Sequence, residues 1–257
     1  MYKARYATNT DGAPSSYHPD DPWGSKGLAV NTICNGADAY TPSGEKVDYR
    51  QCKRLIGLYR QAQAAGWVKQ RNTPYMRFYG VATQDWNQRV PCVISEGRYT
   101  GYFVSTTTWR APGRDPCEPS RYLDALTIPF IVVPNDQKFR RLGMGMGDVA
   151  VVYAPKTDTL VYAVVGDLGP AEGLGEGSIA ISRELTDTRE LPQRRADIKA
   201  YRLPEVVTLV LTERVISDPR SRRDIERTAR KAFEQFGGLR RLQACAAELG
   251  KPRYVLE

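Results

Sequence analysis

Two carboxylic acids, Asp167 and Glu176, stand nine positions apart on either side of a glycine-rich stretch. An apolar run at 160–166 is typical of a strand that ends at Asp167, and residues 178–185 resume at helical spacing. The glycines and the proline between these two segments favour a loop that folds back. Two carboxyl groups that face each other across a cleft are what glycosidic bond cleavage requires, because one protonates the leaving oxygen while the other activates water or attacks the sugar.

Each acid of this pair also has an ordinary explanation. An aspartate after a strand is a common turn residue, and a glutamate near a helix start interacts favourably with the helix dipole. If the pair is catalytic, Asp167 ends an apolar strand, where desolvation raises its pKa and suits it to be the acid. Glu176 precedes a helix whose N-terminal dipole favours the ionised form, so we expect Glu176 to be the base.

The apolar patterning of the whole chain predicts many short strands and few helices. The expected strands are 3–8, 75–82, 90–95, 99–107, 128–133, 148–153, 160–167 and 205–211, and the expected helices are 48–66, 220–236 and 239–249. A chain of 257 residues is long enough to bury a sizeable core. We therefore expect a mainly β or α+β fold, a β-barrel decorated by helices, although an α+β sandwich fits the same pattern.

The cysteine and histidine content indicates neither a metal ion nor a cofactor. The single histidine is His18, and the five cysteines are Cys34, Cys52, Cys92, Cys117 and Cys245. None of them has the C-x-x-C spacing of a zinc site. Pairing the first cysteine with the second and the third with the fourth would close two loops in an extracytoplasmic protein. Five reduced thiols, some of them buried as small hydrophobic groups, are the other interpretation, and the sequence leaves the choice open.

The formal net charge of +8 restricts the partners of this protein. Its positive residues concentrate in 53–71 and 189–241, and such runs are usually solvated helix faces. A cationic protein repels the polycation chitosan and attracts an anionic polymer such as peptidoglycan. We expect no nucleic-acid binding, because the basic residues are not interleaved with the stacking aromatics of a recognised module. The sequence has no apolar run of membrane-spanning length, so we expect no membrane insertion. It also has no signal peptide. The location that we expect is nevertheless secreted or extracytoplasmic.

The sequence resembles the fungal-type chitosanases of glycoside hydrolase family 75 at the segment GDLGPAEGLGEGSIAISREL, residues 166–185. Four further segments resemble the same family in the same order: DGAPSSYHPDD at 11–21, YFVSTTTW at 102–109, RYLDALTIPFIVVP at 121–134 and MGDVAVVY at 146–153. The resemblance runs discontinuously from about 11 to 185 and more faintly to 215. Residues 49–89 and the chain beyond 215 have no counterpart in it.

The resemblance implies that Asp167 and Glu176 match the family's catalytic pair and that hydrolysis inverts the anomeric centre. It also implies a six-stranded barrel of the double-psi type. We therefore expect a chitosanase-like catalytic barrel at 1–215, with a basic helical insert at about 49–89. A C-terminal helical extension at 216–257 is expected to pack on this barrel.

An amino-sugar polymer would lie along aromatic rings and acids, because sugar faces stack on rings and sugar hydroxyls need acceptors. The candidates for substrate binding near the resembling segments are Tyr17, Asp20, Asp21, Tyr102, Trp109, Tyr122 and Asp124. Each also has a structural explanation, as a core aromatic or a turn acid. Asp124 is the best of them, because a lone acid at the start of an apolar strand needs a partner or a role.

Three functions are compatible with these patterns. The first is an endo-acting, inverting hydrolase of β-1,4-linked amino-sugar chains of the chitosan type, which the family resemblance favours. The second is a peptidoglycan glycan-strand hydrolase of the muramidase type, a secreted antibacterial effector with a delivery or immunity partner, which the net charge of +8 favours. The third is a non-catalytic polysaccharide-binding module, against which the presence of both acids counts.

Overall fold

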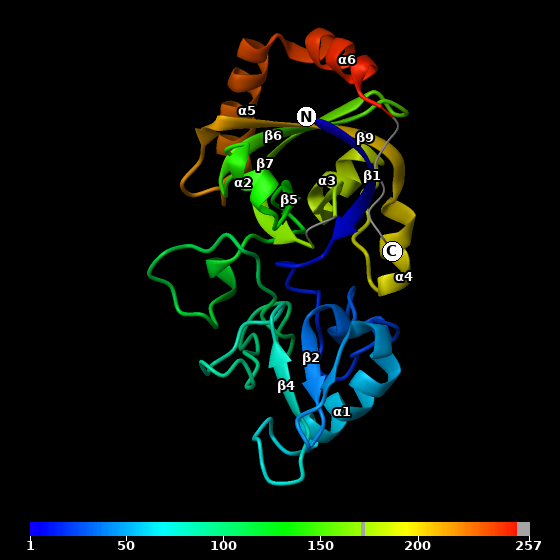
Figure 1. The fold of residues 1–257 in the computed structure, drawn as a ribbon, viewed down its shortest axis with the longest axis vertical. Coiled ribbons are helices and arrows are strands. Elements are labelled where there is room, and N and C mark those ends of the chain that lie inside the picture. Colours follow the sequence, from blue (N-terminus) through cyan, green and yellow to red (C-terminus); the bar gives the residue numbers. More distant parts are fainter. Residues whose placement is uncertain (171–172, 251–257) are drawn as a thin grey trace.

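The computed structural model describes residues 1–170 and 173–250, which form two lobes (Figure 1). One lobe is a closed barrel of six strands in the order β1-β8-β5-β7-β6-β9. Its strands are β1 (Tyr2–Asn9), β5 (Phe130–Pro134), β6 (Asp148–Ala154), β7 (Thr159–Gly169), β8 (Glu176–Ser178) and β9 (Leu203–Val215). β1 pairs with β8, and β5 with β7, in parallel, and the other neighbours are antiparallel. The expected β-barrel decorated by helices is confirmed.

Alternate side chains of the barrel strands fill its interior. Ala150 and Val152 of β6 lie opposite Ala163 and Val161 of β7 in one apolar cluster. Val151, which lies between the first two, belongs instead to the cluster on the outside of the barrel. Because both faces of β6 are buried, its sequence is a continuous apolar run rather than an alternating one.

Two C-terminal helices, α5 (Arg222–Phe236) and α6 (Gly238–Glu248), cover the outside of the barrel (Figure 1). Phe233 of α5 and Leu242 of α6 pack with Val151 in the outer cluster. The helical extension expected at 216–257 therefore packs on the barrel as far as residue 250, and its last seven residues lie outside the described chain.

The basic residues of α5 form a solvated face with local ion pairs. The pairs are Arg222–Glu184, Arg227–Asp224 and Arg230–Glu226. Exposed pairs of this kind contribute little to stability. They do place a negative charge beside each of these arginines, which weakens the positive potential that the charge run alone would produce.

The second lobe is built from residues 10–127 and contains the three-stranded sheet β3-β2-β4 (Figure 1). Its elements are β2 (Ala37–Tyr40), β3 (Lys46–Val47), β4 (Tyr75–Phe78) and α1 (Cys52–Ala64). The core of this lobe includes Tyr17, Tyr59 and Phe103. The segment 49–89, expected as an insert in the barrel, is an integral part of this lobe, since α1 and β4 both pack on β2.

The chain between β4 and β5 contains little regular structure. The strands expected at 90–95 and 99–107 are replaced by isolated bridges, among them Val93 with Phe103. Gly97, between these segments, and Gly101, inside the second, have φ of 83° and 91°, so tight turns interrupt the pattern that an extended strand requires. Here the strand prediction was wrong.

The remaining helices are short. They are α2 (Gln137–Arg141), α3 (Ile179–Leu185) and α4 (Arg195–Ile198), and 3₁₀ turns occur at Ile33–Asn35, Tyr49–Gln51, Pro119–Arg121 and Lys199–Tyr201. Within residues 1–170 and 173–250, no helix has the length and apolar character needed to span a bilayer.

Two disulfides, Cys34–Cys52 and Cys92–Cys117, tie the second lobe together. Cys245, in α6, is free. Because structural disulfides form and persist in oxidising compartments, this pairing is consistent with an extracellular protein.

Replacing both Cys34 and Cys52 with alanine should lower the free energy of unfolding by about 3 kcal/mol, because the unfolded chain regains the entropy of an open loop. Chemical denaturation followed by circular dichroism measures this change. The control Cys245→Ala removes a free thiol and should change the free energy by less than about 0.5 kcal/mol. Equal stability of the double variant and the parent would contradict the expectation.

Candidate active site

Asp167 and Glu176 flank a single residue of the strand between them. In the barrel register, Val132 of β5 lies opposite Asp167 of β7 on one side and opposite Glu176 of β8 on the other. Residues that face each other across neighbouring strands point to the same side of a sheet, so these three side chains form one row. Two strand spacings separate the Cα atoms of the two acids, which corresponds to roughly 10 Å.

This row lies on the outer surface of the barrel wall. Ile131 and Val133, the neighbours of Val132 on β5, belong to the interior cluster. Val132 belongs to a different cluster, which packs outside the wall. Because successive strand residues point to opposite faces, Asp167 and Glu176 project outward with Val132 and not into the barrel.

Both acids lie within strands, which corrects two expectations. β7 continues past Asp167 to Gly169, so Asp167 is not a turn residue. Glu176 begins β8, and the following helix, α3, is capped by Ser178, whose side chain accepts a hydrogen bond from the N–H of Ile181. Glu176 precedes the helix α3, as expected, but it belongs to a short strand and not to the loop, because the chain there completes the barrel between β1 and β5.

Asp167 is held by donors from the other lobe. Its Oδ1 accepts hydrogen bonds from the backbone N–H of Thr108 at 2.8 Å and from the Thr108 hydroxyl at 2.6 Å. The N–H of Leu168 donates to the same oxygen at 2.9 Å. Asp167 is only 6% exposed, and burial raises its pKa above the ordinary range, whereas the bonds from Thr108 and Leu168 favour the ionised form and oppose this shift.

Glu176 lacks such support. None of the described residues donates a hydrogen bond to its carboxylate, and its side chain keeps some exposed surface. Desolvation, followed by the negative charge of Asp167, raises the pKa of Glu176 to about 7. Gly169 leaves room for it, since a Cβ there would lie 3.3 Å from Glu176 Oε2.

A third carboxyl group, Asp11, lies near this pair. It follows β1, and its Oδ1 accepts a hydrogen bond from the hydroxyl of Tyr17 at 2.7 Å. That hydroxyl in turn accepts one from Asn31 at 3.0 Å. Desolvation and then the charge of Asp167 raise the pKa of Asp11 to about 8, while the bond from Tyr17 lowers it. The three acids therefore titrate as one electrostatically coupled group.

Sequence reasoning did not select Asp11, because an aspartate before a glycine is an ordinary turn residue. The segment 11–21, which resembles the chitosanases, begins at this residue, and this resemblance is the feature of the sequence that could have identified Asp11. Tyr79 was missed as well. Its side chain is 50% exposed, and its pKa is raised by burial and then by surrounding acids that include Asp38 and Asp11, so it offers an aromatic ring near the carboxyl group.

The predicted aromatic residues have different positions. Tyr17, at 1% exposure, is an anchor for Asp11 and has no ring face available to a ligand. Trp109 and Tyr122 are also buried, in two separate apolar clusters. Tyr102 is partly exposed and lines a cavity away from the carboxyl groups.

The predicted acids outside the pair serve mainly the local backbone. Asp21 is buried and accepts hydrogen bonds from the N–H groups of Ser25 and Lys26, both at 2.9 Å. Asp124 accepts a bond from the N–H of Leu126 at 2.9 Å, and burial raises its pKa. Asp20 is exposed. None of these three is among the groups that shift the pKa of Asp167 or Glu176.

In the described part of the chain, no group of three histidine, cysteine or acidic side chains is arranged to hold a metal ion. A scan against models of protein families finds no match for this chain. A search of curated proteins finds no matching relative either. The resemblance to the chitosanases therefore stays a prediction that rests on the segments quoted above.

The coupled acids should make the protein less stable as the pH rises from about 4 to 8. In the unfolded chain Asp11 loses its proton near 3.8, whereas in the folded chain it keeps the proton up to about 8. Between these values the folded state binds more protons, so the free energy of unfolding falls as the pH increases. Asp11→Asn should flatten this dependence, because the amide cannot ionise.

Chemical denaturation at a series of pH values measures the effect. Asp20→Asn makes the same chemical change at an exposed position and should follow the parent curve. A curve for Asp11→Asn parallel to that of the parent would show that Asp11 does not retain its proton.

Proposed function

We propose that this protein is an endo-acting glycoside hydrolase that cleaves β-1,4 bonds in an amino-sugar polysaccharide of the chitosan type, using Asp167 and Glu176. The observation that carries the proposal is the row of Asp167, Val132 and Glu176 on the outer face of the barrel. The intervening strand sets the two acids roughly 10 Å apart at Cα. This Cα separation is compatible with inversion, for which the carboxyl groups themselves must lie about 6.5 to 9.5 Å apart to leave room for a water molecule.

The surroundings of the two acids support acid and base roles opposite to those expected from the sequence. When two coupled acids share one proton, the charge resides on the better-solvated oxygen. Three N–H and O–H donors converge on Asp167 Oδ1, so Asp167 is the carboxylate and general base. Glu176, with its pKa raised to about 7, keeps the proton and is the general acid.

The proposed reaction consists of two proton transfers, one bond that forms and one bond that breaks. Asp167 accepts a proton from water, and the water oxygen forms a bond to the anomeric carbon from the face opposite to the leaving group. The bond between the anomeric carbon and the glycosidic oxygen breaks, and Glu176 delivers its proton to that oxygen. Exchange of protons with solvent returns Asp167 to the ionised and Glu176 to the neutral form.

The acidic cluster favours an amino-sugar substrate. Asp167 carries the negative charge of this group, because Asp11 and Glu176, with pKa values raised to about 8 and about 7, hold their protons. A protonated amino group on the sugar is attracted to the charge of Asp167. Tyr79, half-exposed beside Asp11, supplies a ring on which a sugar face can stack.

Peptidoglycan is the second candidate substrate, and the net charge of +8 is the observation that favours it. The two disulfides fit a secreted protein that meets either polymer outside the cell. As a peptidoglycan hydrolase the protein would be an antibacterial effector, with an immunity or delivery partner. The ion pairs on α5 lower the local positive potential of that helix but leave the net charge unchanged, so the attraction would come from the charge of the whole protein.

Asp167→Asn and Glu176→Gln should each lower turnover by about 10²- to 10⁴-fold, because each removes one proton transfer from the transition state. Release of reducing ends from chitosan and from purified peptidoglycan, assayed side by side, measures the loss and identifies the polymer. Asp187→Asn makes the same chemical change at an exposed position outside both proposed sites, and this control should keep the parent rate. Binding of a polymer without new reducing ends, equal in parent and variants, would identify a binding module and refute the hydrolase.

The first product released from a β-linked substrate should carry an α-configured reducing end, because a water molecule attacks from the opposite face. Proton NMR spectra taken early in the reaction, before the anomers equilibrate, measure this configuration. A β-configured first product would indicate retention and a direct attack by one of the carboxylates.

A further inference from the structure

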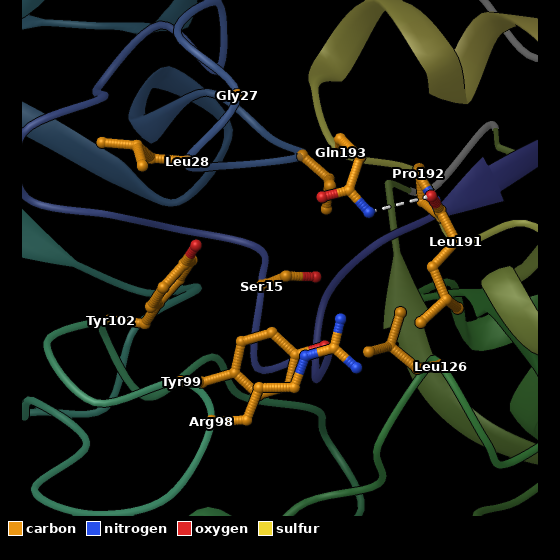
Figure 2. Close-up of a pocket in the computed structure, with 11 residues that line it drawn as sticks. Ser15, Gly27, Leu28, Arg98, Tyr99, Tyr102, Leu126, Leu191, Pro192 and Gln193 are labelled. Carbon is orange, nitrogen blue, oxygen red and sulfur yellow. Dashed lines mark hydrogen bonds between the residues drawn. The ribbon is translucent and has the colours of Figure 1, made fainter.

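A cavity of about 210 Å³ lies between the two lobes, apart from the carboxyl groups (Figure 2). Its lining residues come from four regions: the loop after β1 and its continuation, the segment around Arg98, Leu126 before β5, and the chain after α3. It includes none of Asp11, Asp167 and Glu176. The cavity is smaller than the roughly 300 to 1,000 Å³ of pockets for drug-sized ligands, so its size suits one small unit.

Ser15 is the first residue that points to a ligand. Its side chain is 91% buried, given its exposure of 9%, and its Oγ has no hydrogen-bond partner within residues 1–170 and 173–250. Figure 2 shows the hydroxyl directed toward the space that the other labelled residues surround. A buried hydroxyl normally has a partner, because leaving it unsatisfied costs free energy. A polar group of a bound molecule would supply that partner once a small shift of the lining side chains uncovers the Oγ, which is inaccessible to solvent in this structure.

Arg98 is the second residue that points to a ligand. Its guanidinium lies over the ring of Tyr99, with the guanidinium carbon 5.5 Å from the ring centroid. No acidic side chain of the described residues forms an ion pair with Arg98, and it is the one formally charged residue among those that line the cavity. Arg98 is exposed at the cavity, and a guanidinium can donate two parallel N–H bonds to the two oxygens of a carboxylate.

The other lining groups are typical of a sugar site. The rings of Tyr99 and Tyr102 lie 5.5 Å apart and nearly perpendicular, at 86°, and His18 packs edge-on against Tyr102 at 4.7 Å. Gln193 donates a hydrogen bond to the carbonyl of Leu191 at 3.2 Å, and its amide lies at the cavity (Figure 2). Aromatic rings combined with a few placed polar groups recognise molecules that have both hydroxyl groups and apolar faces.

We propose that this cavity binds one sugar residue that carries a carboxylate, with the carboxylate on Arg98 and a sugar oxygen on Ser15. Two sources share this chemistry: the lactyl-substituted sugar of peptidoglycan and a uronic acid. The site is independent of the proposed hydrolase reaction, since its residues do not include the carboxyl groups of that reaction.

NMR titration of the full chain with N-acetylmuramic acid tests the proposal, and N-acetylglucosamine, which lacks the carboxylate, is the matched probe. Resonances of Arg98, Tyr99 and Tyr102 should shift with N-acetylmuramic acid at concentrations at which N-acetylglucosamine leaves them unchanged. Arg98→Gln should weaken the binding at least tenfold, because it removes a charge-assisted pair. Glucuronic acid is the third probe; tighter binding of it than of N-acetylmuramic acid would assign the site to uronic acids, and the reverse would assign it to peptidoglycan.

Two further variants separate this site from the rest of the molecule. Ser15→Ala removes a hydroxyl that has no partner in the described chain, so it should fold as the parent does while binding the probe severalfold more weakly. Glu176→Gln should bind N-acetylmuramic acid with the parent affinity, whether or not the hydrolase proposal holds. Equal affinity for the two N-acetyl sugars, an unchanged affinity in Arg98→Gln, or shifts confined to the surroundings of Glu176 would overturn the proposal.

Discussion

The hydrogen bonds from Thr108 to Asp167 are the interaction on which the rest of this architecture depends. They join a residue of the second lobe to a buried acid of the barrel. The next residue, Trp109, extends the connection by donating its N–H to the carbonyl of Gly166 at 3.0 Å. Without these donors a nearly inaccessible carboxylate would be strongly destabilised, because burial of an unpaired charge is costly. Thr108 of the second lobe thus supplies hydrogen bonds that water would otherwise make to Asp167.

The same principle explains how Asp11 is placed. Tyr17 reaches it from the core of the second lobe, and two glycines make room for the ring. A Cβ at Gly36 would lie 2.8 Å from the Tyr17 ring, and one at Gly80 would lie 3.0 Å from its hydroxyl. Any larger residue at either glycine would push Tyr17 away from Asp11. The acids of the barrel and the packing of the other lobe are therefore parts of one arrangement.

The elements that the sequence predicted well are those whose own residues determine them. The apolar runs of β6 and β7 and the amphipathic pattern of α5 were found because burial on defined faces leaves a period in the sequence. Asp167 and Glu176 were selected as a pair because such periodic segments flank the glycine-rich stretch between them, and because that stretch resembles the chitosanases. Its chemical roles were assigned from the chain neighbours alone, and the hydrogen bonds from Thr108, which favour the opposite assignment, come from 59 positions away.

Features formed by distant residues left no such pattern. β8 is three residues long and exists because β1 and β5, which the second lobe separates in the chain, both pair with it. This pairing has a consequence for biosynthesis. β1 is synthesised before the other strands of the barrel and pairs with β8 and, as far as Thr208, with β9, so the barrel cannot close until residue 208 has been synthesised. Asp11 follows β1, whereas Asp167 and Glu176 lie on β7 and β8, so the three acids come together only when this closure occurs.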